Sequence, residues 1–127
     1  MPKLRSGSPA RPGAYLAMIG AVLQIAAGLA SIAGSTTGGV AFGSFTPTLI
    51  AALLLTGAAT IAVSIFALRG VRIAWAFALS IHGTLFVVLL LAAPTIASIG
   101  VPGALALAPA LLCAAITTLF AFATNDF

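Results

Sequence analysis

His82 is the single histidine of this sequence, and it lies ten residues after Arg72 inside a long apolar run. A helix rises about 1.5 Å per residue, so the imidazole would sit roughly 15 Å deep, near the centre of a bilayer. An ionisable group at that depth is a functional-site candidate that could ligate haem, relay a proton or bind a polar ligand. The alternative is a neutral imidazole that bonds a neighbouring helix, because no acid and no second histidine accompany it.

Two further polar side chains fall at a similar depth. Gln24 lies about ten residues into the first apolar run, and Thr60 lies nine residues before Arg69. Hydrocarbon offers no hydrogen-bond partners, so each side chain should turn inward. We therefore predict a polar layer of Gln24, Thr60 and His82, with Gln24 or Thr60 within one side chain's reach of the imidazole.

Small and hydroxyl-bearing residues recur at helical spacing. Residues four apart share one face of a helix, and small side chains let two helix backbones approach closely. We expect these residues to lie at helix contacts: Gly20, Gly28, Thr56, Ser64, Ser80 and Thr84. The hydroxyls of Thr56, Thr60 and Ser64 can instead bond the carbonyls four residues earlier, or line a water-filled path.

Residues for other chemistry are few. Cys113 has no adjacent base or cation, so it is expected to be a packing residue. Neither apolar run holds an Asp or Glu, which excludes a carboxylate from any proton-coupled transport. The sequence also lacks a phosphate-binding loop, a dinucleotide fingerprint and a zinc motif. We expect no catalytic, cofactor-binding or metal-binding residues, and no enzyme.

The amino-acid composition indicates the class of protein to which these residues belong. Of 127 residues, 62% are hydrophobic and 5% are charged, against about 25% charged in an average soluble domain. The six charges leave two uncharged stretches, 12–68 and 73–125, each longer than 50 residues. One membrane helix needs about 20 residues, so each stretch holds two helices and a turn. The sequence predicts an all-α, polytopic membrane protein with a bundle of four transmembrane helices.

Breaks in the apolar pattern place the four helices at about 14–33, 47–68, 73–93 and 102–124. Pro94 should end the third helix, and Pro47 suits the first turn of the second. Residues 1–13 are expected to form a disordered basic arm, and 125–127 a short tail. The first helix could also be a signal peptide, but its apolar run is longer than the hydrophobic region of a signal peptide, which usually has about 7–15 residues.

The cations set the expected orientation. Lys3, Arg5, Arg11, Arg69 and Arg72 all fall on one side of the predicted bundle. The positive-inside rule then places both termini in the cytoplasm, with these side chains near lipid headgroups. The cations form no folded basic face, so we expect no nucleic acid partner. Arginine outnumbers lysine four to one, and alanine and glycine are abundant. This usage is typical of high-GC bacteria and favours a bacterial inner membrane.

Three functions fit these residues. The first is a structural or accessory subunit of a larger membrane complex, which the small-residue faces favour. The second is a small oligomeric transporter or channel built around the polar layer. The third is a membrane enzyme or cofactor carrier that uses His82. The expected partners are the lipid bilayer and other membrane subunits or further copies of the chain.

Overall fold

The protein is an all-α bundle of four long helices. The computed structural model describes residues 3–37, 47–98 and 100–127. The helices are α1 (Ala10–Thr37), α2 (Pro47–Leu68), α3 (Arg72–Ser98) and α4 (Gly103–Phe122), followed by a short 3-10 helix over Thr124–Asp126. Each long helix contains a segment long and apolar enough to cross a membrane. The predicted fold class is therefore confirmed.

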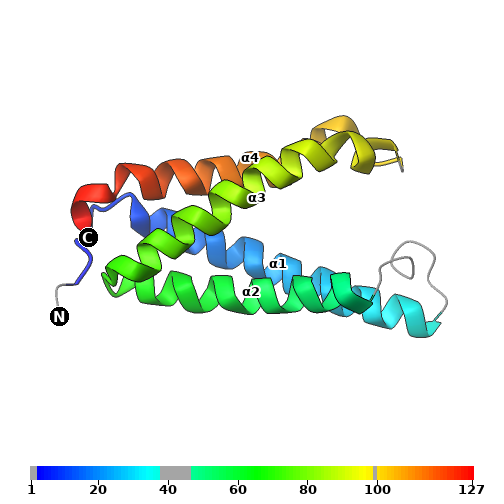
Figure 1. The fold of residues 1–127 in the computed structure, drawn as a ribbon, viewed down its shortest axis with the longest axis horizontal. Coiled ribbons are helices and arrows are strands. Elements are labelled where there is room, and N and C mark those ends of the chain that lie inside the picture. The colour runs from blue at the N-terminus through cyan, green and yellow to red at the C-terminus, as the bar shows by residue number, and fades with distance from the viewer. Residues whose placement is uncertain (1–2, 38–46, 99) are drawn as a thin grey trace.

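The helices are arranged as two hairpins (Figure 1). Helix α1 packs closely on α2, and α3 on α4, whereas the two hairpins touch each other less extensively. Both chain ends and the α2–α3 turn lie at the same end of the bundle, where the hairpins meet (Figure 1). We call this the closed end. Toward the opposite end, the open end, the α3–α4 hairpin diverges from the α1–α2 hairpin.

The core of the closed end is built mainly from alanine. Small side chains let helix backbones approach closely, which is the main source of attraction between helices in lipid. Two large side chains, Ile116 and Phe120, fill the space that remains and are fully buried. The buried cluster comprises Leu4, Ala10, Ala14, Ala17, Ala67, Ala74, Ala78, Ile116, Phe120 and Ala123.

Helix α1 begins at Ala10, four residues before the expected start. Pro12 and Gly13 suggested that the arm continues to residue 13. Pro12 instead falls in the first turn of α1, where backbone N–H groups have no carbonyl partner within the helix, so the missing N–H of proline removes no hydrogen bond. Ser8 Oγ accepts a hydrogen bond from the Ala10 N–H at 3.2 Å, which caps the helix. Helix α1 thus begins within the segment 1–13 that was expected to form a disordered arm, and Leu4 and Ser8 of that segment are buried against the closed end.

An ion pair joins the two ends of the chain. Arg5 Nε lies 2.8 Å from one carboxylate oxygen of Asp126. The Ser8 hydroxyl donates to the other carboxylate oxygen at 2.6 Å. We call these three residues the terminal clasp. Asp126 is the only acidic residue of the chain, and the clasp ties α1 to the segment after α4.

Two further boundaries have clear physical causes. Helix α3 continues to Ser98 with Pro94 inside it, because a proline costs a membrane helix only one backbone bond and such losses are tolerated there. The α2–α3 turn needs glycine, since Gly70 adopts φ 79°. Its N–H bonds the Ala67 carbonyl, and the Val71 N–H bonds that of Phe66, as in a Schellman motif. The first expected outer loop, 34–46, lies largely outside the described residues.

Candidate functional site: a crevice between the hairpins

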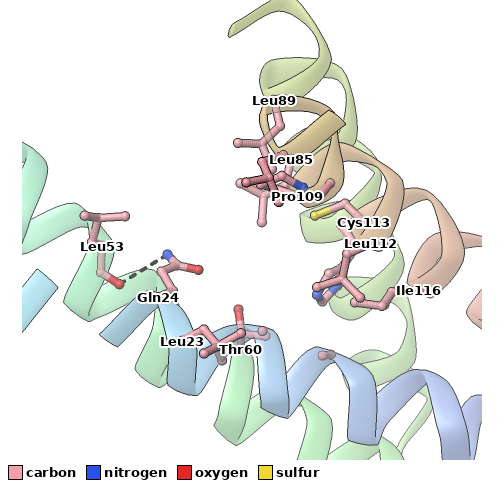
Figure 2. Close-up of a pocket in the computed structure, with 16 residues that line it drawn as sticks. Leu23, Gln24, Leu53, Thr60, Leu85, Leu89, Pro109, Leu112, Cys113 and Ile116 are labelled. Carbon is pink, nitrogen blue, oxygen red and sulfur yellow. Dashed lines mark hydrogen bonds between the residues drawn. The ribbon is translucent and has the colours of Figure 1, made fainter. Parts of the chain in front are cut away.

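A crevice of about 520 Å³ lies between the two hairpins and is lined by all four long helices. Its walls are mostly leucine, alanine and other apolar side chains, and none of its sixteen lining residues is charged. Figure 2 shows the opposing walls, with Gln24 and Thr60 on the α1–α2 side and Leu85, Leu89 and Pro109 on the α3–α4 side. The crevice is therefore an apolar space at membrane depth.

The three residues of the predicted polar layer all line this one crevice. No hydrogen bond joins any two of them in the described part of the chain. The Gln24 amide donates from Nε2 to the Leu53 carbonyl on α2 at 3.2 Å. His82 Nδ1 bonds the Ala78 carbonyl of its own helix at 2.8 Å. The layer is thus a shared lining and not a bonded network, and the expected pairing with the imidazole is not formed.

The geometry of His82 fixes its tautomer. A carbonyl oxygen can only accept, so Nδ1 must carry the proton that it donates to Ala78. In the neutral ring, Nε2 is then left with an acceptor lone pair. The residue is buried, and its ring stacks on Phe120 with centroids 6.4 Å apart. Packing against Phe120 holds the imidazole at the edge of the closed-end core, facing the crevice.

Thr60 and Ser64 carry buried hydroxyls that have no hydrogen-bond partner among the described residues. This outcome differs from the back-bonded stripe that the sequence allowed. Thr117 and Thr118 on α4 do form such bonds, to the carbonyls four residues earlier at 2.7 and 2.8 Å. Of the two unpartnered hydroxyls, only that of Thr60 belongs to a residue that lines the crevice.

Gly20 and Gly28 of α1 lie at helix contacts. A methyl group added at Gly28 would lie 2.9 Å from Leu54 Cδ2, and one at Gly20 would lie 3.4 Å from Leu112 Cδ2. Gly57 on α2 is tighter still, because its added carbon would meet Ile25 Cγ1 at 2.6 Å and the Ala21 carbonyl at 3.2 Å. Sequence reasoning missed Gly57, although a glycine inside an apolar run is the signal of such a contact.

The remaining hydroxyl residues lie elsewhere. Thr56 is half-buried, whereas Ser80 and Thr84 are exposed on α3. The expected contact at Ser80 and Thr84 is therefore not made within this chain, because His82 and Ala78 occupy the inward face of α3 instead. The five cations lie at the closed end or in the segments that reach it, and Arg69 sits over the Phe66 ring at 5.8 Å.

Metal-binding groups are sparse in the part of the chain that the structure describes, where no three of His, Cys, Asp and Glu come together. His82 and Cys113 both line the crevice from the α3–α4 hairpin. His82 can offer one nitrogen lone pair, and the Cys113 thiol is a weak donor. What the arrangement offers chemically is hydrogen bonding inside an apolar space.

Comparison with family models, curated proteins and solved structures finds no match to this chain. The fold and the site nevertheless define a class. The protein is a small integral membrane protein whose four helices line an uncharged crevice.

Proposed function

We propose that the protein is a non-catalytic accessory subunit of a larger membrane complex. The proposal places it in a bacterial inner membrane with both termini in the cytoplasm. One observation carries the proposal. Ser80 and Thr84 present two hydroxyls on the exposed face of α3, with no bond to another described residue.

The depth of these residues makes that exposure costly. Ser80 and Thr84 lie eight and twelve residues after Arg72, which places them roughly 12 to 18 Å into the membrane. Hydrocarbon cannot satisfy a hydroxyl, and serine and threonine are frequent at contacts between membrane helices. Ala76 extends the same exposed face one turn earlier. A transmembrane helix of another subunit would cover these three small residues and supply the missing bonds.

Purification of the tagged chain in mild detergent tests this proposal. We expect a stoichiometric partner that the Ser80→Leu and Thr84→Leu variants lose, because leucine blocks close approach of a second helix. Thr118→Leu is the matched control, since Thr118 is also exposed but its hydroxyl already bonds Ala114. A partner retained by both α3 variants, or a chain that purifies alone, would overturn the proposal.

A second candidate is a small oligomeric transporter or channel. It is supported by the three polar side chains that line the crevice, Gln24, Thr60 and His82. A homo-oligomer without other subunits favours this candidate. Transport that His82→Leu abolishes while the oligomer survives would place the histidine in its pathway.

The proposed orientation has its own test in a Cys113→Ala background. Ala104 lies at the open end and Thr124 at the closed end, and both are exposed. A membrane-impermeant maleimide applied to intact cells should label Ala104→Cys, but label Thr124→Cys only after permeabilisation. The reverse pattern would contradict cytoplasmic termini.

A further inference from the structure

The crevice contains hydrogen-bonding capacity that the chain itself does not use. Thr60 is 4% exposed, and its hydroxyl has no partner among the described residues. Figure 2 shows that hydroxyl projecting from α2 toward the space between the hairpins. A buried hydroxyl without a partner is destabilising, so its placement calls for a group that bonds it.

Acceptor groups face the same space. Because His82 Nδ1 donates to Ala78, the neutral ring offers Nε2 as an acceptor. Gln24 uses its amide nitrogen on Leu53, and Figure 2 shows its oxygen turned away from Leu53 toward the crevice. The crevice is thus lined by two acceptors, His82 Nε2 and the Gln24 oxygen, and by one hydroxyl that can donate.

A ligand that matches these groups is constrained in three ways. It must donate a proton to an acceptor and accept one from Thr60, which a hydroxyl group does. It must be uncharged, because none of the lining residues is charged. It must be largely apolar, because leucines from all four helices form the walls. The volume of about 520 Å³ falls within the range of about 300–1,000 Å³ of small-molecule sites.

We propose that the crevice binds one uncharged, lipid-soluble alcohol or phenol. Its hydroxyl accepts from Thr60 and donates to the acceptors of the polar layer, and its apolar body lies among the leucines. The hairpins diverge toward the open end (Figure 1), and we expect a lipid-soluble ligand to enter the crevice from the bilayer on that side. This site goes beyond the proposed subunit role, because it uses the inner walls of the bundle and not the exposed face of α3.

Photolabelling of the purified full chain in nanodiscs tests the site. The probes are a long-chain alcohol with a diazirine in its tail, its methyl ether and the matching carboxylic acid. We expect the alcohol to label crevice residues such as Leu85 and Leu105, and to do so about threefold more than the ether. That ratio corresponds to one membrane hydrogen bond of average strength. The charged acid should label least.

Variants separate binding from folding. Thr60→Val keeps the shape of the side chain and removes only the hydroxyl, so it should reduce alcohol labelling to the level of the ether. Thr60→Ser should restore the preference. Thr118→Val is the control, because its hydroxyl is exposed and already bonded to Ala114. Since the Thr60 hydroxyl has no partner among the described residues, Thr60→Val should melt no lower than the parent protein.

Three outcomes would overturn the ligand site. The first is equal labelling by alcohol and ether. The second is labelling by the alcohol that Thr60→Val leaves unchanged while the protein stays folded. The third is a crevice in the intact complex that crosslinks to a partner's helix and excludes the probe. Because the alcohol–ether comparison and the Thr60 variants use the isolated chain, their failure leaves the partner test at Ser80 and Thr84 independent.

Discussion

The two ends of the bundle contain similar apolar residues but are packed in different ways. At the closed end, alanines bring the helices together and Phe120 fills the centre. The Trp75 indole N–H donates to the Phe120 carbonyl at 2.7 Å, and its ring stacks on Phe127 with centroids 5.7 Å apart. Farther along the bundle, Leu53, Leu85 and Leu105 line a crevice and do not close it.

The comparison shows what holds helices together in lipid. Lipid tails are as apolar as leucine, so burial of leucine adds little attraction there, and close packing and hydrogen bonds decide instead. The closed end has both, and the terminal clasp as well. It therefore holds the two hairpins together, whereas the inner surface farther along the bundle lines the crevice.

The largest effect is expected from Phe120→Ala. Phe120 is fully buried at the closed end, and removal of a buried phenylalanine costs about 3–5 kcal/mol where the cavity cannot collapse. Thermal unfolding in detergent should show a large fall in melting temperature. Phe122→Ala is the control, since Phe122 is 76% exposed. Equal melting temperatures for the two variants would mean that the closed end does not hold the hairpins together.

The next largest effect is expected from Asp126→Asn in the terminal clasp. Asp126 is largely buried, while Arg5 is 73% exposed. We expect a loss of about 1.5 kcal/mol, at the low end for hydrogen bonds to charged groups because solvent screens Arg5. Combining Asp126→Ala with Ser8→Ala should cost less than the two separate losses, because each removes the same Ser8–Asp126 bond. Lys3→Ala is the control, and fully additive losses would contradict the clasp.

Part of this arrangement could be predicted from the sequence. Charge spacing predicts four membrane helices, and depth counting from the expected cytoplasmic helix ends predicts that Gln24, Thr60 and His82 lie at one level; all three line one crevice. Hydrogen-bond partners could not be predicted in the same way. A backbone carbonyl is within reach of almost any polar side chain on a helix, so Gln24 bonds Leu53 and His82 bonds Ala78.

Long-range contacts between the chain ends were also beyond sequence reasoning. Ser8 and Asp126 are 118 positions apart, and their pairing depends on how α1 and α4 meet. A short segment rich in proline and cations has the composition of a disordered arm. In the structure, Leu4 of this segment packs in the alanine core, and Arg5 pairs with Asp126, the one acidic residue of the sequence.

A smaller effect is expected from Gly57→Ala, which tests packing within the α1–α2 hairpin. The added carbon would meet Ile25 and the Ala21 backbone, and overpacking costs about 1–3 kcal/mol. Alanine recovers about 1 kcal/mol of that through its higher helix propensity. The net loss should be about 1 kcal/mol. Gly83→Ala is the control, since its nearest neighbour is Thr117 Cγ2 at 3.9 Å, and it should stabilise slightly. If both variants stabilise, α1 and α2 are less tightly packed than described.

The smallest effect is expected from Gln24→Met, which removes a hydrogen bond beside the crevice. The Gln24 amide reaches the Leu53 carbonyl at 3.2 Å, and hydrogen bonds between membrane helices average about 0.6 kcal/mol in double-mutant cycles. Methionine keeps the length of the side chain, so packing should change little. Trp75→Phe removes the matching bond at the closed end, where the shorter 2.7 Å contact should cost more.

The stability loss of Gln24→Met, divided by that of Trp75→Phe, compares the hydrogen bond at the crevice with the one at the closed end. If Gln24→Met costs as much as Trp75→Phe, the hydrogen bond at the crevice is as important to the fold as the one in the closed-end core. The leucine walls would then be held as firmly as the alanine core. If Gln24→Met leaves the melting temperature unchanged but weakens alcohol labelling, the amide acts on the ligand. That result would separate the stability of the hairpins from the chemistry of the space between them.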